Sequence, residues 1–358
     1  MRVPRLVLLM LTLLLRSIFA GPIVAIELPD GELQAVPDEY LPFFAADPEA
    51  VTMKIFHWRP RWSKTALDPV TCWIVSLRAM LEMQFSNVNA PIRDETKQYH
   101  YDDYPDVAVT VQVLDGFGKT PMNYAFISVG YAIERLAVKS RYQYLTAWLM
   151  RKDTPVLSVM VHPARPVPDE DPQMQTLRAR EDSANSDATI VRNDTAAAIS
   201  SPYPGFELAT IGVVPVPPDP LRVWVSFQGE ELEMASFFGA LLAAMTNLGL
   251  RPPGRDFEPE IRQDSRPFRS FIFITWYKKP VTAQPSFFLN WHAAYGVLDV
   301  AEHAAQQFRT TGKFKESSAI IEAAWVWGSD LKPVGKMYVT KNMMPPEPPG
   351  VAATIETS

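Results

Sequence analysis

The chain contains 358 residues, with 34 Lys and Arg, 40 Asp and Glu, and a formal net charge of −6. This mildly acidic balance lacks the basic footprint that binding to nucleic acid or to an anionic membrane surface needs. The apolar fraction of 47% is ordinary for a globular core, and the length allows one large domain or two domains of roughly 100–200 residues.

The first 20 residues have the three parts of a secretory signal peptide. Arg2 and Arg5 supply the positive start, residues 6–15 form an apolar run, and Ala20 is a small residue before the expected cleavage point. The run is shorter than the about 20 apolar residues that a transmembrane helix needs. The segment predicts a secreted, extracellular protein cleaved near Ala20, with no membrane contact beyond the signal peptide. An uncleaved N-terminal anchor is the alternative.

Cys72 is the single cysteine, so the chain has no intrachain disulfide. The fold must instead be held by its apolar core, and the chain is long enough to build one. Cys72 lies in a segment that is apolar on most sides, which is typical of a small buried residue and not of a nucleophile.

The first half of the chain begins with an expected extended lead-in over residues 21–50. Asp68 and Pro69 then form an N-cap and first-turn pair, which predicts the start of a helix with an apolar stripe. Arg78 and Glu82 are spaced as an i,i+4 ion pair on its polar side. The other expected elements of this half are a strand over 51–58, a polar loop over 87–106, a strand over 107–114, a helix over 120–140 with 142–151 as its extension or a short second helix, and strands over 155–162 and 206–214.

Residues 165–203 are rich in Pro, Asp, Ser and Ala and have no sustained apolar period. Such a segment cannot bury enough apolar surface to offset the entropy of ordering, so it predicts a disordered insertion in the first half. Asn193-Asp194-Thr195 within it is an N-glycosylation sequon, and Asn193 is the expected attachment site of a secreted glycoprotein.

The second half repeats the order of the first. Its expected elements are strands over 222–228, 271–277, 318–327 and 336–340 and helices over 230–247 and 287–310. Each half then reads βαβαββ, which predicts an α+β fold of two duplicated units, each a sheet with two helices on one face, related by a pseudo-two-fold axis. A single continuous sheet through both halves is the alternative. The expected units are residues 51–214 and 221–341, followed by a disordered tail over 342–358.

The chain carries none of the strong catalytic motifs. It has no glycine-rich phosphate loop, no paired-cysteine metal site, no His-Glu-x-x-His and no Gly-x-Ser-x-Gly. We therefore expect no cofactor and no metal. An enzyme is not excluded, because the members of a catalytic triad need not be adjacent in sequence.

The most interesting ionisable set lies on the expected last helix. His292, Asp299 and His303 share a narrow stripe at helical spacing, and Asp299 with His303 is an i,i+4 pair that could act as a general base. His292 lies about 10 Å from Asp299 along the helix axis, so the three cannot bind one metal ion. The simpler interpretation is a solvated flank of the helix.

Residues 99–104 are a candidate binding loop. They place His100, Asp102 and Asp103 among three tyrosines, and loops carry function more often than regular elements. The two carboxylates could bind a cation or act on a sugar if their separation suits. An acidic solvated turn with packed tyrosines is the alternative.

Residues 56–62 are a second candidate binding segment. His57 and Trp58 lie among further aromatic residues and arginines, a composition that suits stacking or cation–π contact with a ligand. Strand-end aromatic residues that pack under a loop are the alternative.

Two classes of function follow from these features. The first is a secreted, non-catalytic protein that binds an unidentified small ligand or protein partner in a cleft between its repeated halves, because ligand sites prefer domain interfaces. The second is a secreted hydrolase that uses scattered Asp, Glu and His residues. No nucleic-acid partner is expected in either case.

Overall fold

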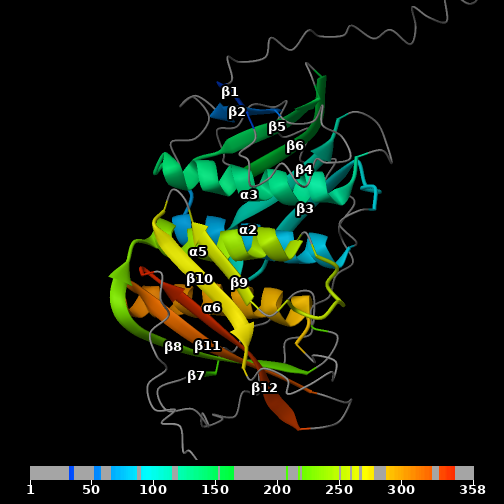
Figure 1. The fold of residues 1–358 in the computed structure, drawn as a ribbon. Coiled ribbons are helices and arrows are strands. Elements are labelled where there is room, and N and C mark those ends of the chain that lie inside the picture. Colours follow the sequence, from blue (N-terminus) through cyan, green and yellow to red (C-terminus); the bar gives the residue numbers. More distant parts are fainter. Residues whose placement is uncertain are drawn as a thin grey trace, which may run out of the picture. The chain divides into compact units, whose positions relative to one another are not determined.

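Two six-stranded antiparallel sheets and four helices make up the described part of the chain in this computed structural model, so the fold is α+β (Figure 1). The described residues all belong to one unit, Glu32–Ser358. They are residues 32–35, 52–57, 66–86, 90–114, 120–151, 154–164, 207–208, 217, 220–249, 251–258, 260–265, 268–277, 288–324 and 330–342.

The first sheet has the strand order β1-β2-β5-β6-β4-β3. The elements of this half are β1 (Glu32–Ala35), β2 (Thr52–His57), α2 (Pro69–Phe85), β3 (Thr96–Tyr101), β4 (Tyr104–Val113), α3 (Met122–Val138), β5 (Leu145–Arg151) and β6 (Thr154–Pro163).

The second sheet has the strand order β7-β8-β11-β12-β10-β9. The elements of this half are β7 (Glu207–Leu208), β8 (Leu221–Leu232), α5 (Met234–Gly249), β9 (Glu260–Ser265), β10 (Ser270–Trp276), α6 (Asn290–Thr311), β11 (Phe314–Ala324) and β12 (Leu331–Thr340). Counted from its own first strand, this sheet repeats the strand order of the first sheet, with helices in the same places along the chain.

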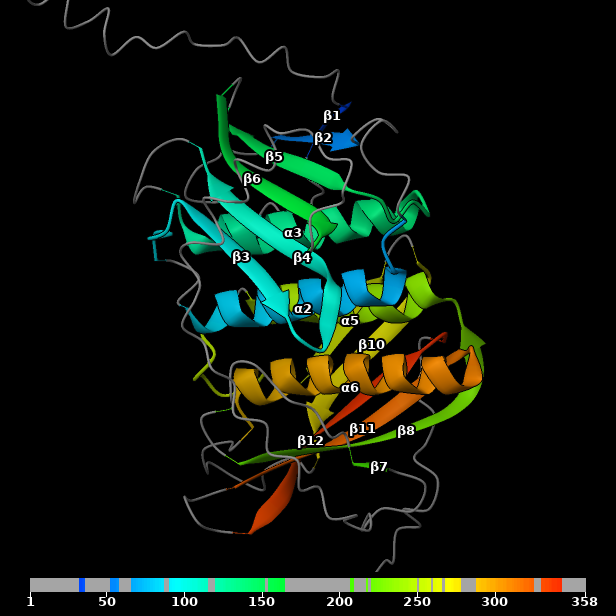
Figure 2. The same cartoon turned by 180° about the vertical axis from the view of Figure 1, so that it is seen from behind.

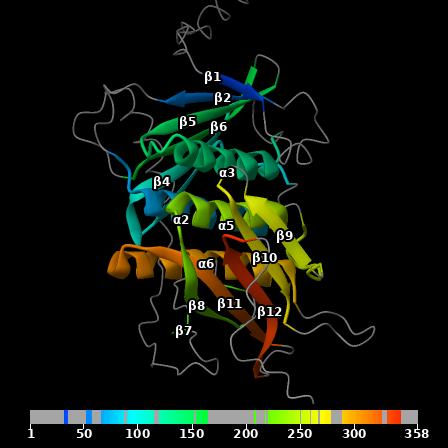
Figure 3. The same ribbon diagram turned by 60° about the vertical axis from the view of Figure 1, so that its left-hand side comes forward.

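The four helices lie between the two sheets. Helices α2 and α3 cover one face of the first sheet, and α5 and α6 cover one face of the second (Figures 1 and 3). The two pairs also contact each other, because α2 touches both α5 and α6, and α3 touches α5. None of the helices described here is long and apolar enough to cross a membrane.

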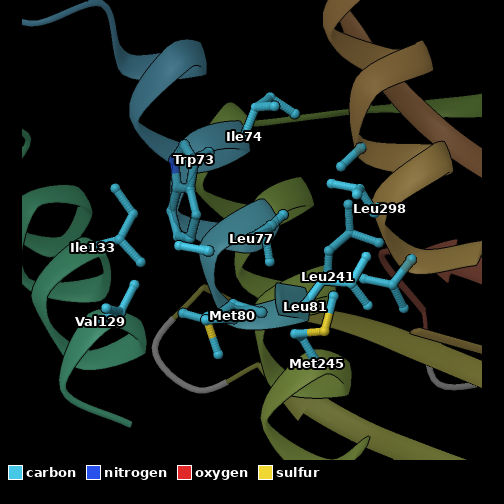
Figure 4. Packing of buried hydrophobic residues seen from close by; sticks show 14 of the residues in the cluster. Trp73, Ile74, Leu77, Met80, Leu81, Val129, Ile133, Leu241, Met245 and Leu298 are labelled. Carbon is cyan, nitrogen blue, oxygen red and sulfur yellow. The ribbon is translucent and has the colours of Figure 1, made fainter. Parts of the chain in front are cut away.

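Helix α2 is the centre of this arrangement. Its start follows the expected local signals, since the Asp68 carboxylate accepts a hydrogen bond from the Thr71 backbone N–H at 2.7 Å and Pro69 occupies the first turn. Figure 4 shows its side chains packing at once against α3, α5 and α6. The polar side expected for this helix is therefore wrong at Arg78, which is buried, because α2 has neighbours on every side.

Aromatic packing and close backbone approach join the halves. Trp73 of α2 stacks on Phe238 of α5 with ring centroids 5.6 Å apart. Gln84 donates a hydrogen bond to the Leu248 carbonyl at 3.0 Å, both groups being buried. Gly249 of α5 lies directly against the ring of Phe126 of α3. These contacts form one continuous apolar core across both halves.

Several expected elements need correction. Residues 142–151 are neither a helix extension nor a second helix, because β5 pairs inside the sheet with both β2 and β6. The expected loop over 87–106 contains β3 and the start of β4, which form a hairpin. Of the expected strand over 206–214, the described part is β7, and it pairs with β8 and so belongs to the second sheet. In each case strand pairing overrides the weak local pattern.

Gly249→Ala should destabilise the fold. The added Cβ would lie 2.2 Å from Cζ of Phe126, a fully buried ring at a contact between helices of the two halves. We expect a loss of about 1–3 kcal/mol in the free energy of unfolding, which is typical of overpacking, measured by urea denaturation.

Gly254→Ala is the matched control. A Cβ at Gly254 would meet nothing within 4 Å, so this change should be neutral or slightly stabilising. Equal stability losses for the two variants would contradict the packing that the structure shows at Gly249.

Candidate functional site

Arg78 is the charged residue around which the candidate site forms. It projects from the middle of α2, is 2% exposed, and holds the carboxylate of Glu302 on α6 with both arms of its guanidinium. Nη2 of Arg78 donates to Oε2 of Glu302 at 2.9 Å, and Nε donates to Oε1. This two-pronged geometry is the strongest form of side-chain ion pair, and here it joins the first half of the chain to the second.

The β3–β4 hairpin closes over Arg78. Asp102 and Asp103 form its two-residue loop, and Tyr101 pairs with Tyr104 across the strands. The Arg78 guanidinium lies 5.1 Å from the centroid of the Tyr101 ring and 5.0 Å from that of Tyr104. The loop therefore lies beside α2 and α6 (Figure 2), and tyrosine faces cover a cation that the protein has removed from water.

Strand alternation places Tyr99 and Tyr101 on the inner face of this hairpin, and the pairing of β3 with β4 has a register shift between them. Tyr99 and Tyr101 are both buried, whereas His100 between them is exposed. The Tyr101 hydroxyl donates to Glu82 at 2.7 Å, and burial raises the pKa of the Glu82 carboxyl. The tyrosines are thus anchors, and His100 is held at the surface.

The outer rim of the site carries one further charge of each sign. The Asp103 carboxylate lies 3.8 Å from Nη2 of Arg78, and its side chain is 44% exposed. The Arg309 guanidinium of α6 lies 5.7 Å from the centroid of the Tyr104 ring. Burial and the Glu302 charge raise the pKa of the Tyr104 hydroxyl to about 12, so this group stays neutral.

Asp299 lies one helical turn before Glu302 on α6 and is buried. Its Oδ1 has no hydrogen-bond partner among the described residues. Burial raises the pKa of Asp299 well above its ordinary value, the neighbouring Glu302 raises it further, and Arg78 opposes the change. A buried oxygen without a hydrogen-bond partner lowers the free energy of unfolding by about 1–3 kcal/mol, so this carboxyl destabilises the core.

His292 serves the start of α6. Its Nδ1 accepts a hydrogen bond from the Leu289 backbone N–H at 2.9 Å, and its ring is parallel to that of Phe288. Burial lowers the pKa of His292 to about 3, so the imidazole is neutral at physiological pH and carries its proton on Nε2. The solvated helix flank expected here is wrong for both His292 and Asp299, because α6 packs against two other helices and a sheet.

The remaining members of the expected set lie apart. His303 stacks on Phe227 of β8 with ring centroids 5.6 Å apart. Asp102 is exposed at the hairpin tip, and His57 pairs with Leu145 through the strand backbone of β2. Trp58 and Asn193 lie outside the described residues. The structure thus brings Asp103 and Asp299 to the neighbourhood of Arg78, but it does not gather the histidines there.

The site has few groups suited to covalent chemistry. Cys72 is fully buried, and burial raises the pKa of its thiol. In the part of the chain that the structure describes, no group of three or more His, Cys, Asp and Glu side chains could hold a metal ion. Arg78 and Glu302 neutralise each other. The arrangement can present the exposed carboxylates of Asp102 and Asp103 to a partner.

Sequence reasoning missed the Arg78–Glu302 pair. One signal was present, because the segment from Pro69 to Phe85 is apolar on nearly all sides, which predicts a helix buried all round. An arginine in the middle of such a helix requires a buried anion. No sequence pattern shows that Glu302, 224 positions away, supplies it.

Glu302→Gln should be strongly destabilising, because it removes the buried anion and leaves Arg78 with only the partly exposed Asp103 carboxylate at 3.8 Å. We expect a loss of about 3–5 kcal/mol in the free energy of unfolding, measured by urea denaturation at pH 7. Replacing both partners together, Arg78→Met with Glu302→Leu, should recover most of that loss.

Glu230→Gln is the matched control. Glu230 pairs with Lys341 at 2.9 Å, but both side chains are more than half exposed, so removing this carboxylate should change stability little. A Glu302→Gln variant as stable as Glu230→Gln would show that the buried pair does not join the halves.

Comparison with known proteins returned no matching family model and no matching curated protein. Two similar solved structures were found. The tandem DUF26 ectodomain of the Arabidopsis thaliana cysteine-rich receptor-like protein PDLP8 aligns over 77% of this chain and 93% of its own, with 9% identity and a TM-score of 0.18. A hot dog fold protein of unknown function from Alicyclobacillus acidocaldarius aligns over 83% and 94%, with 10% identity and a TM-score of 0.12. TM-scores this low carry no argument about fold or function.

Proposed function

We propose that this protein is a secreted, non-catalytic binding protein that engages its partner at the β3–β4 tip. The observation that carries the proposal is the anchoring of that tip. Asp102 and Asp103 are exposed on a two-residue loop, while the flanking Tyr101 and Tyr104 are buried against Arg78. Exposed charge on a loop held by a rigid scaffold is typical of a binding site.

The structural roles of the other reactive side chains support a non-catalytic protein. His292 is neutral, and its Nδ1 accepts a hydrogen bond from the Leu289 backbone at the start of α6. The Cys72 side chain of α2 is fully buried. The His162 ring bonds Thr110 through Nε2 at 2.8 Å and the Pro163 carbonyl through Nδ1 at 2.7 Å inside the first sheet. A general base or nucleophile must instead reach a substrate.

The proposal includes two related halves, residues 32–163 and 207–340. Both sheets have the same strand order, and the helix contacts agree with a two-fold relation, because α2 touches α6 as α3 touches α5. Side chains fill the apolar contact between the helices (Figure 4). We therefore place the binding surface at the edge of that contact, where the hairpin reaches α6, and not in a cleft along it.

A secreted hydrolase is the alternative, and one observation favours it. A carboxyl whose pKa is raised, as in Asp299, is a common general acid. However, Oδ1 of Asp299 is buried, whereas a substrate in solution could reach the carboxylate of Asp103, which is 44% exposed. The enclosed position of Asp299 agrees better with a structural role.

The partner that this tip suits presents positive charge, since two exposed carboxylates and a net charge of −6 attract a basic surface. The secreted full chain should bind an immobilised Lys- and Arg-rich peptide in preference to neutral and acidic peptides of the same length. Asp102→Lys should weaken that binding by about fivefold or more at low ionic strength, measured by surface plasmon resonance.

Glu260→Lys is the control for net charge. Glu260 is also exposed, but it lies on the edge strand β9 of the other sheet, so its reversal should leave peptide binding almost unchanged. Equal effects of the two reversals would show that attraction is diffuse, and no preference among the peptides would reject the proposed partner class.

Secretion is tested separately, because residues 1–20 lie outside the described residues. The signal-peptide pattern predicts that the secreted protein begins near Gly21, which N-terminal sequencing would show. A soluble intracellular product that retains Met1 would contradict the extracellular assignment.

A further inference from the structure

Asp299 lies on α6 one turn before Glu302, which binds Arg78 of α2, so its carboxyl is close to a contact between helices from different halves of the chain. The side chain is 5% exposed, and Oδ1 has no hydrogen-bond partner among the described residues. A neutral carboxyl can occupy such a place at moderate cost, but an unpaired carboxylate there lacks both water and a donor.

The nearest cation is already engaged. Arg78 uses Nε and Nη2 for Glu302, and Nη2 also faces Asp103. A second carboxylate beside Glu302 therefore adds repulsion without gaining a two-pronged partner of its own. Ionised Asp299 requires either a water molecule or a displacement of α6 from α2.

The other elements that pack against α6 are α5, β8 and β11. Their basic residues are Arg222 on β8 and Lys315 on β11, both partly exposed, and neither is among the charges that act on Asp299. Helix α5 contains no ionisable side chain. On β11, Glu322 accepts a hydrogen bond from Trp224, and Glu316 accepts from backbone N–H groups at the sheet end. The titratable and charged groups that face Asp299 or its immediate neighbours are Arg78 and Glu82 on α2, Tyr295, Glu302 and His303 on α6, and Tyr101, Asp103 and Tyr104 on the hairpin.

We infer that the contact between α6 and α2 is a pH-sensitive joint, closed while Asp299 holds a proton and loosened when that proton leaves. This joint is coupled to the β3–β4 tip through Arg78, which binds Glu302 across the helix contact and also packs on the rings of Tyr101 and Tyr104. Loosening α6 would therefore also release the support of the tip. This device does not depend on what the tip binds.

The direction of the effect follows from linkage. The pKa of Asp299 is raised in the folded protein, so protonation of Asp299 makes its full contribution to the free energy of unfolding at pH values below the ordinary aspartate pKa of 3.8. This contribution falls as the pH rises from 3.8 to the raised pKa of the folded protein, since over that range the unfolded chain has already released the proton. Burial raises the pKa of Glu82 and Glu302 as well, so these carboxyls act in the same direction and the Asp299 contribution must be isolated by mutation.

Hydrogen exchange of α2 and α6 in the full chain tests the joint, with rates corrected for the intrinsic effect of pH. In the wild type, protection of these helices should fall with rising pH, by up to about tenfold per unit for one ionising group. In Asp299→Asn, which cannot ionise, part of that pH dependence should be lost and protection at high pH should increase. An unchanged pH dependence in this variant would overturn the inference.

Asp94→Asn is the matched control, because Asp94 is exposed and precedes β3. In this variant, the hydrogen-exchange rates of α2 and α6 should equal those of the wild type at every pH. If Asp299→Asn fails to fold, Asp299→Leu removes the same proton site without adding a polar group. The infrared carbonyl band of a protonated carboxyl in the wild type is an independent measurement. A spectrum in which every carboxyl is ionised just above the ordinary aspartate pKa would equally overturn the inference.

Discussion

Burial of the Arg78 guanidinium is the constraint on which the rest of the structure depends. The side chain is 2% exposed in the middle of a helix surrounded by other elements. A cation there is tolerated only with an anion and with groups that replace water. Glu302 supplies the anion, and the rings of Tyr101 and Tyr104 cover the guanidinium. Those three groups come from α6, β3 and β4, so one charge orients a helix from the second half and a hairpin from the first.

The apolar core explains why the charge can be held so firmly. Trp73 stacks on Phe238, and Gly249 allows α5 to approach the ring of Phe126. Each contact crosses between helices of the two halves, so separating the halves would expose large apolar surfaces together with the ion pair. The charged site and the core therefore stabilise each other, and the exposed hairpin tip has rigid support on its inner side.

The candidate site could be predicted in part. Residues 99–104 and Asp299 were recognisable as concentrations of ionisable and aromatic groups, and the structure places Tyr101, Asp103 and Tyr104 against Arg78. Their partners were not recognisable. Arg78 has the i,i+4 spacing of a surface ion pair with Glu82, and helical periodicity alone does not distinguish that role from a bond to Glu302 across the molecule. His292 illustrates the same limit, because its use at the start of α6 depends on where Leu289 begins the helix.

The sequence by itself determined the α+β class, the four helices and the strands β2, β4, β6, β8, β10, β11 and β12, because apolar periodicity and N-cap signals such as Asp68-Pro69 act within a few residues. It did not determine β3, β5 or the sheet to which β7 belongs, because strand pairing joins residues far apart in the chain. Tertiary structure also decided the states of Arg78 and Asp299. Burial depends on the neighbours that packing supplies. It makes Arg78 bind the carboxylate of Glu302, and it raises the pKa of Asp299.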